Sequence, residues 1–227
     1  MALATSVREH VEGIEALEIV YAQGMALVRK AMRLGAPPDP GAAAWLLVEA
    51  SANSDPLNSL AQAIESFPGT SEVAVADSPG ARQRLWAYRE LHTEAIATLG
   101  VPHKLDVTLP MGQIADFAAD VPAQVCRAMG SQGKEVKVIL FGHLGDGNIH
   151  VNMIGPGPED QRAEDAVAHM VLERGGSISA EHGVGVAKLK YVTSARSPGD
   201  VEFMRRLKAG LDPEGILNPG VLLPPPV

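Results

Sequence analysis

The sequence is poor in aromatic residues and cysteine and has no excess of positive charge. Phe, Trp and Tyr make up 4% of its 227 residues, and its formal net charge at pH 7 is −8. A protein that binds nucleic acid or an anionic membrane needs a clustered basic face, and none is visible here, so we expect neither partner. The one cysteine, Cys126, lies in a helical pattern and is expected to be a small buried thiol.

Long uncharged hydrophobic runs are missing as well. No such run approaches the length needed to span a membrane. Arg8, Glu9 and Glu12 fall where the apolar core of a signal peptide would lie. These absences predict a cytoplasmic protein without a membrane span. Because 46% of the residues are hydrophobic, the chain is long and apolar enough to bury one large core.

Hydrophobic periodicity predicts helices and strands in succession, with a mostly helical last third. A hairpin signal and the small number of strands favour an α+β fold with a mainly antiparallel sheet and helices on one face. Helices are expected at residues 16–34, 57–67, 79–99 and 111–130. Strands are expected at residues 43–50, 71–76, 105–109, 136–142 and 148–154.

The stretch FGHLGDGNIHVN, residues 141–152, indicates a β-hairpin with two histidines. Asp146-Gly147 suits a two-residue type I′ turn, because both central positions need a positive φ. That turn would place His143 opposite His150, with their Cβ atoms about 5 Å apart, and Asn152 on the same face. Two imidazoles at this spacing suit one metal ion, although paired histidines also stack on half-buried sheets without a metal.

A third metal ligand is suggested by GGSISAEHGVG, residues 175–185. Its glycines let the backbone approach another surface closely, and they flank Glu181 and His182 just before a helical segment. Two histidines and one carboxylate form an open-sided ligand set for Zn, Mn or non-haem Fe. In the alternative interpretation, Glu181 caps the following helix and His182 is an ordinary loop residue.

These stretches occur together with LWAYRELHTEAI (85–96), HKLDVTLP (103–110) and DPEGILNP (212–219). In combination they resemble the C-terminal half of the FAD-linked oxidases that act on D-2-hydroxy acids, which include D-lactate, D-2-hydroxyglutarate and glycolate dehydrogenases. The likeness covers essentially the whole chain. It implies an antiparallel sheet with ferredoxin-like subdomains in residues 1–197, where substrate and metal bind. Residues 198–227 would form a helix and tail that pack on a flavin domain.

The resemblance also implies a role for each matching residue. The metal ligands would be His143, His150 and Glu181. His182 would accept the proton of the substrate hydroxyl, and Asn218 in the tail would lie by the flavin.

Substrate contacts implied by the resemblance would come from Arg89, Thr93, Lys104 and Asn152. Arg89 and Thr93 are four residues apart, so on one helix they would share a face. They would then offer a guanidinium and a hydroxyl to a carboxylate.

The reaction that the resemblance implies is oxidation of a D-2-hydroxy acid to a 2-oxo acid. A divalent metal would make the substrate hydroxyl easier to deprotonate, and His182 would take the proton. Hydride would leave C2 for FAD, whose redox chemistry belongs to the cofactor.

The expected position of FAD is outside this chain. The family's FAD-binding domain lies N-terminal to the matching half, whereas twelve residues precede Gly13 here. We therefore expect FAD to bind on a missing or separate domain or subunit, and the chain alone to be inactive. The tail also differs from the family, because Val221 follows Asn218-Pro219-Gly220 in place of the usual lysine.

Two other functions are compatible with the residues. One is a non-catalytic module that binds metal and carboxylate after loss of the flavin domain. The other is a metal-dependent hydrolase that uses His143, His150 and Glu181 around a water. The hydrolase gives Arg89, Thr93 and Lys104 no purpose. Homo-oligomer formation is compatible with all three functions.

Overall fold

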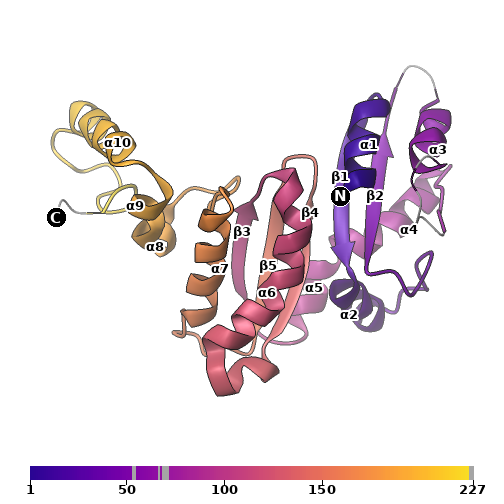
Figure 1. Ribbon diagram of the computed structural model, residues 1–227, viewed down its shortest axis with the longest axis horizontal. Coiled ribbons are helices and arrows are strands. Elements are labelled where there is room, and N and C mark those ends of the chain that lie inside the picture. Colours follow the sequence, from indigo (N-terminus) through magenta and orange to yellow (C-terminus); the bar gives the residue numbers. More distant parts are fainter. Residues whose placement is uncertain (53–54, 66, 68–71, 225–227) are drawn as a thin grey trace.

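A computed structural model of the chain describes residues 1–52, 55–65, 67 and 72–224. The chain forms a five-stranded antiparallel sheet in the order β2-β1-β4-β5-β3, with helices packed around it (Figure 1). The strands are β1 (Ile14–Tyr21), β2 (Ala44–Ala50), β3 (His103–Thr108), β4 (Lys137–His143) and β5 (Asn148–Ile154). The helices are α1 (Ala2–His10), α2 (Ala22–Met32), α3 (Leu57–Glu65), α4 (Pro79–Glu90), α5 (His92–Ala97), α6 (Ile114–Met129), α7 (Arg162–Glu173), α8 (Gly185–Lys188), α9 (Val192–Ala195) and α10 (Pro198–Leu211).

One face of the sheet carries the main hydrophobic core. Because side chains alternate along a strand, Leu17, Leu140 and Ile149 point to the same side, and they belong to one buried cluster with residues of α1, α6 and α7. Phe117 of α6 lies at 0% exposure in this cluster. The apolar stripe of α6 is therefore what holds the sheet on this side.

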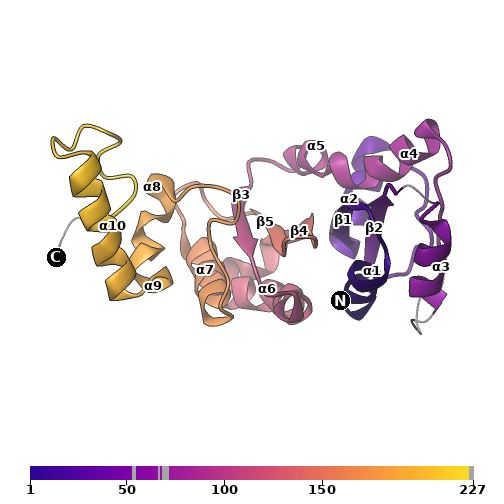
Figure 2. The ribbon, with the colours of Figure 1, turned by 90° about the horizontal axis from the view of Figure 1, so that it is seen from above.

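The opposite face is divided between apolar and polar residues. Val20 of β1 packs with α2 and α5, and Ile139 and Phe141 of β4 pack with Ile96 of α5. Figure 2 shows α4 and α5 on one side of the sheet and α6 and α7 on the other. The predicted α+β fold and antiparallel sheet are confirmed, and helices also cover the second face over β1 and β4.

The predicted helix at residues 16–34 was wrong in its first part. Residues 14–21 form β1, which pairs with β2 on one side and with β4 on the other. Leu17 and Ile19 face the core while Glu18 and Val20 face the opposite side, which is the period of a strand. Helix α2 begins only at Ala22.

Three smaller differences concern local structure. The sequence analysis missed α1. Of the predicted strand at residues 71–76, residue 71 lies outside the described part, and residues 72–76 form no strand. The predicted helix at 79–99 is divided at Leu91, whose ψ of 11° ends α4 before α5 begins.

Helix α10 stands apart from the sheet at the C-terminal end of the chain (Figure 1). Ser197 and Asp200 form a capping box and Pro198 occupies its first turn, which explains why the helix begins here. Phe203, Leu207 and Leu211 follow at intervals of four residues and are 62%, 48% and 79% exposed. Among the described residues, no helix is long and apolar enough to cross a membrane.

His92 of α5 is a buried titratable group within this fold. Its side chain is 0% exposed and its ring centroid lies 4.6 Å from that of Phe141. Nδ1 lies 3.2 Å from the carbonyl oxygen of Arg89, and Nε2 has no hydrogen-bond partner in the described part of the chain. Burial, aided by the charge of Arg89, lowers the pKa of His92 to about 4.

We predict that His92 makes the protein less stable in mild acid. Its folded pKa lies below the unfolded value of 6.5, so the unfolded chain binds more protons between these values. The stabilisation is complete above pH 6.5 and is lost as the pH falls toward 4. From pH 7 to pH 5 the free energy of unfolding should fall by about 2 kcal/mol through this residue.

Urea unfolding at both pH values measures this effect. The His92→Phe variant keeps a ring against Phe141 but cannot titrate, so its stability should change less with pH. An equal pH dependence in the two proteins would contradict the prediction.

Candidate functional site

The sequence-predicted site residues of β3, β4 and β5 lie on one face of the sheet. Residues that are paired across antiparallel strands point to the same side, and the register places them in transverse rows. The first row runs Glu18, His143, Asn148; the second runs Phe141, His150, Asp106; the third runs Ile139, Asn152, Lys104. This face, which we call the polar face, therefore carries both predicted metal-binding histidines and two of the predicted substrate contacts.

The hairpin turn is longer than predicted. Residues 144–147 form a four-residue turn, so His143 pairs with Asn148 and His150 pairs with Phe141. The predicted direct pairing of His143 with His150 was wrong. The reason is Leu144, which is 1% exposed and whose N–H donates to the carbonyl of Leu17 at 2.7 Å, so it belongs to the core rather than to the hairpin ladder.

The two histidines are nevertheless neighbours, because they are related diagonally across β4 and β5. Their ring centroids lie 5.0 Å apart in an edge-on arrangement. The predicted proximity is confirmed, although the register that was expected to produce it is different.

Glu18 lies at the centre of the contacts on β1 and β4. It is 4% exposed and accepts hydrogen bonds from Arg89 Nε at 2.6 Å and from His143 Nδ1 at 2.7 Å. The guanidinium of Arg89 also lies 4.6 Å from the ring centroid of Phe141, and its Nη2 is 3.2 Å from His143 Nε2. One buried carboxylate thus holds a predicted substrate residue and a predicted metal ligand.

The charged groups in this cluster shift one another's pKa values. Burial alone would raise the pKa of Glu18, but the hydrogen bond from His143 and the charge of Arg89 outweigh it and lower the pKa. The hydrogen bond to Glu18 raises the pKa of His143 despite burial. Glu18 is therefore ionised at neutral pH and can only accept hydrogen bonds.

Asp106 of β3 makes the corresponding contacts on the other side of the histidine pair. His150 Nδ1 donates to Asp106 Oδ1, and His182 Nε2 lies 3.0 Å from Asp106 Oδ2. The hydrogen bond from His150 lowers the pKa of Asp106, with burial opposing it. Asp106 therefore links the predicted metal ligand to the predicted proton acceptor.

The loop that carries Glu181 and His182 is held against the end of β3. Thr108 and Ser177 exchange two backbone hydrogen bonds of 2.8 Å. A Cβ at Gly176 would lie 2.4 Å from the carbonyl oxygen of Thr108, so only glycine allows this approach.

Glu181 is exposed, and its Oε1 accepts a hydrogen bond from Asn148 Nδ2 at 3.3 Å. Asn148 is the register partner of His143. The loop thus brings the third predicted ligand to the same polar face.

The four predicted substrate residues differ in their contacts and in their exposure to solvent. Arg89 is held by Glu18, whereas Thr93 is exposed on α5. The prediction that Arg89 and Thr93 share one helix was wrong, because Leu91 separates α4 from α5. Lys104 is exposed and pairs in register with the buried Asn152.

The donor types on the polar face suit a divalent metal, but the donors are not gathered around one point. His143 and His150 each use Nδ1 for a carboxylate, as metal-ligating histidines commonly do. Within the described residues, no group of three or more His, Cys, Asp or Glu side chains is arranged to hold a metal ion. The two imidazoles suit such an ion in chemistry, their ring centroids lie 5.0 Å apart, and Glu181 lies next to them through Asn148.

Asn218, the predicted flavin contact, lies on the exposed tail in a left-handed conformation with φ of 47°. The tail is ordered by Asp212, which accepts hydrogen bonds from the N–H groups of Ile216 and Leu217 at 2.9 and 3.0 Å. Lys208 donates to the same carboxylate. The DPEGILNP stretch is therefore a turn built on one aspartate.

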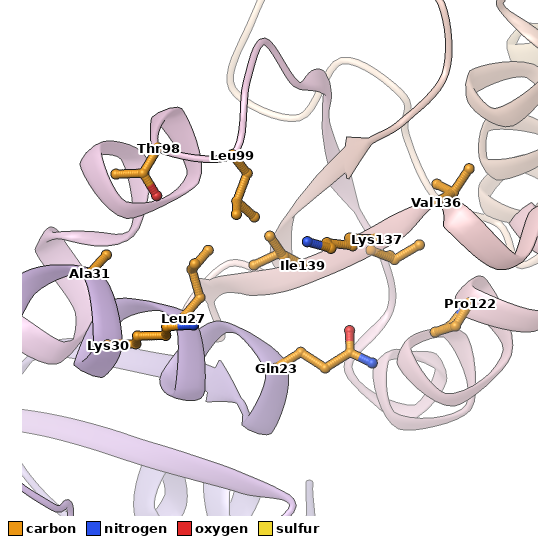
Figure 3. Close-up of a pocket in the computed structure, with 11 residues that line it drawn as sticks. Gln23, Leu27, Lys30, Ala31, Thr98, Leu99, Pro122, Val136, Lys137 and Ile139 are labelled. Carbon is orange, nitrogen blue, oxygen red and sulfur yellow. The ribbon is translucent and has the colours of Figure 1, made fainter.

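A groove of about 610 Å³ lies away from these residues, where β4 begins, between α2, the end of α5 and α6 (Figure 3). Its lining is largely apolar, with Leu27, Leu99 and Ile139, and Lys30 and Lys137 add positive charge. Its described lining residues include no histidine, carboxylate or cysteine. The groove therefore lacks the histidine and carboxylate groups that gather on the polar face.

Glu18, Asp106 and Asn148 were missed by the sequence analysis. Asp106 could have been found, because it alternates with Lys104 in HKLDVTLP and so shares its face. Glu18 was hidden by the helical interpretation of its segment. A single charged residue among the apolar residues of ALEIV is the signal that a strand interpretation would have used.

Comparison with known proteins identifies the family of the chain. The family described as "FAD linked oxidases, C-terminal domain" matches residues 1–222. The chain belongs to this family.

Two curated relatives are dehydrogenases of the same acid by name. The chain is 37% identical over 146 residues to "D-2-hydroxyglutarate dehydrogenase" of Stutzerimonas stutzeri (strain A1501), covering 61% of this chain and 30% of the relative. It is 33% identical over 221 residues to "D-2-hydroxyglutarate dehydrogenase, mitochondrial" of Rattus norvegicus, covering 94% and 40%. The chain thus spans at most two fifths of the length of these relatives.

A solved structure, "4-ethylphenol oxidase from Gulosibacter chungangensis: isoeugenol complex", matches with a TM-score of 0.60 at 17% identity. The match covers 99% of this chain and 51% of that one. It supports the fold.

We predict that Gly142→Ala destabilises the hairpin that carries the histidines. A Cβ at this position would lie 2.2 Å from the carbonyl oxygen of Asn148, so the β4–β5 pairing must shift. The free energy of unfolding in urea should fall by about 1–3 kcal/mol. Gly145→Ala in the same hairpin is the control, because its Cβ would meet no atom within 4 Å. Equal effects of the two substitutions would contradict this account.

Proposed function

We propose that this chain is the substrate- and metal-binding part of an FAD-dependent dehydrogenase that oxidises a D-2-hydroxy acid to a 2-oxo acid. D-2-hydroxyglutarate is the first candidate substrate, because both relatives named above are dehydrogenases of this acid. The observation that carries the proposal is the joint position of Arg89, His143 and His150 on the polar face, with Glu18 bonded to the first two.

In this proposal the cationic and polar residues of the face bind the acid. Arg89 offers the guanidinium hydrogens that Glu18 does not use, and Lys104 offers a second positive charge from β3. Thr93 and Asn152 supply a hydroxyl and an amide. Two separate cationic side chains suit a substrate with two carboxylates, which favours 2-hydroxyglutarate over a monocarboxylate such as lactate.

His182 is the proposed proton acceptor for the substrate hydroxyl. It lies on the loop after Ser177, and its Nε2 faces the Asp106 carboxylate at 3.0 Å. The Asp106 carboxylate fixes the position of the ring, as a histidine that accepts a proton requires.

His143, His150 and Glu181 are the proposed ligands of a divalent metal. When bound, the metal would supply Lewis acidity at the substrate hydroxyl and FAD would supply the hydride acceptor. The neutral imidazoles and the carboxylate suit Zn, Mn or Fe. Asp106 and Glu18 would hold the two rings through Nδ1 and would not themselves be metal ligands.

The C-terminal helix is proposed to dock on the part of the enzyme that carries FAD. Phe203, Leu207 and Leu211 present an apolar stripe that no described residue covers, as their exposure indicates. Asn218 follows on the turn built by Asp212 and would come close to the flavin. Residues 198–227 would then act as the contact between this chain and the flavin-bearing domain.

We expect the purified chain to bind D-2-hydroxyglutarate more tightly when a divalent metal is present. Calorimetric titrations with the chelator-treated chain, repeated after addition of Zn²⁺ or Mn²⁺, measure the two affinities. His150→Ala removes a proposed ligand and should reduce the metal-dependent affinity by about 10-fold or more.

His169→Ala is the matched control, because His169 is an exposed histidine of α7 outside the polar face. It should bind like the unmodified chain. Identical affinities in His150→Ala and His169→Ala would contradict the proposed metal-assisted binding. Binding of D-lactate as tight as that of D-2-hydroxyglutarate would contradict the proposed preference for a substrate with two carboxylates.

A further inference from the structure

Each histidine of the pair is bonded to a carboxylate on the adjacent strand. His143 Nδ1 donates to Glu18 Oε1 at 2.7 Å, and His150 Nδ1 donates to Asp106 Oδ1. Both contacts join residues directly opposite in the sheet register, Glu18 with His143 and Asp106 with His150. The pairing is therefore built into the backbone of the sheet rather than into flexible loops.

The carboxylates determine which ring nitrogen carries the proton. An ionised carboxylate can only accept, so Nδ1 of each ring must carry a hydrogen. In a neutral imidazole the lone pair is then on Nε2, the atom that is free to bind a cation. The same hydrogen bonds fix the rotation of both rings.

A second partner holds each carboxylate in turn. Arg89 Nε donates to Glu18 at 2.6 Å, and His182 lies 3.0 Å from Asp106. Glu18 is only 4% exposed. Burying an ion pair gains little stability compared with apolar packing, so stability alone does not explain the buried Glu18–Arg89 pair beside the two rings.

We propose that Glu18 and Asp106 are positioning residues, an inference that rests on the proposed function. They orient His143 and His150 and hold their Nε2 lone pairs available for a divalent cation. Neither carboxylate contacts the cation or the substrate itself.

The Glu18–Arg89 hydrogen bond also links binding of the cation to binding of the anionic substrate. Arg89 Nη2 lies 3.2 Å from His143 Nε2, the atom that would bind the cation. A cation on Nε2 displaces that contact, while the bond from Nε to Glu18 keeps Arg89 in place. The released Nη2 is then available to a substrate carboxylate, so the cation should strengthen anion binding through Arg89.

The experiment measures Zn²⁺ affinity, without turnover, by competition with a chromogenic chelator. Glu18→Gln and Asp106→Asn keep the size of each side chain but replace an acceptor-only group with an amide that can donate to Nδ1. The wrong tautomer then becomes accessible. We expect each substitution to weaken Zn²⁺ binding about 10- to 100-fold.

Glu49→Gln is the matched control. Glu49 lies on β2 and accepts hydrogen bonds from Arg82 at 2.8 Å and Trp86 at 2.5 Å, so this change also breaks an ion pair to α4 but touches no histidine. It should leave Zn²⁺ affinity within about twofold of the unmodified chain. Circular dichroism establishes that each variant is folded.

A second readout is the tautomer itself. Imidazole ¹⁵N shifts of the metal-free chain should show Nδ1-protonated rings at positions 143 and 150, and a change at position 150 in Asp106→Asn. The Asp106 side chain is 26% exposed, so this variant tests the proposal even if the more buried Glu18→Gln does not fold.

Three results are distinguishable. Weaker Zn²⁺ binding in Glu18→Gln and Asp106→Asn but not in Glu49→Gln supports the positioning role. Unchanged Zn²⁺ binding in both Glu18→Gln and Asp106→Asn overturns the positioning role and leaves the proposed function standing. Absence of Zn²⁺ and Mn²⁺ binding in the unmodified chain overturns the positioning role together with the metal part of the proposed function.

Discussion

The carboxylate of Glu18 is the group on which the arrangement of the polar face depends. It is buried on a central strand, where an isolated charge would be strongly destabilising. Hydrogen bonds from Arg89 and His143 offset that cost. They also require α4 to lie over β1 and β4 to pair with β1 at one register. A single buried charge therefore couples the position of a helix, the register of two strands and the direction of the Arg89 guanidinium.

The sequence predicted the fold class because the signals for it are local. Residues 148–154 alternate apolar and polar side chains after a glycine turn, and β5 has those bounds. The segment that became β1 reads equally well as part of a helix, since Leu17, Val20 and Met25 also recur at helical spacing. Pairing with β2 and β4 decides in favour of a strand, and those contacts come from distant parts of the chain.

Several of the predicted residues lie on one face of the sheet, whereas their carboxylate partners were not predicted. His143, His150, Asn152 and Lys104 share a face because period-two alternation carries that information within each strand. The partner of His143 is 125 residues away and that of His150 is 44 residues away. No spacing rule reaches across such separations, so the contacts of Glu18 and Asp106 with the two histidines became visible only once the strand order was known.

A short ladder between β1 and β4 joins two parts of the sheet, β2-β1 and β4-β5-β3. β1 and β4 pair through three residue pairs, Glu18–His143, Ile19–Gly142 and Val20–Phe141. The β4–β5 ladder has seven pairs, so fewer backbone contacts join β1 to β4 than join β4 to β5. The Glu18–His143 hydrogen bond is part of this short connection, so the position of the His143 ring depends on how the two parts of the sheet meet. A neighbouring domain that clamps both parts together would tune the site without touching any residue in it.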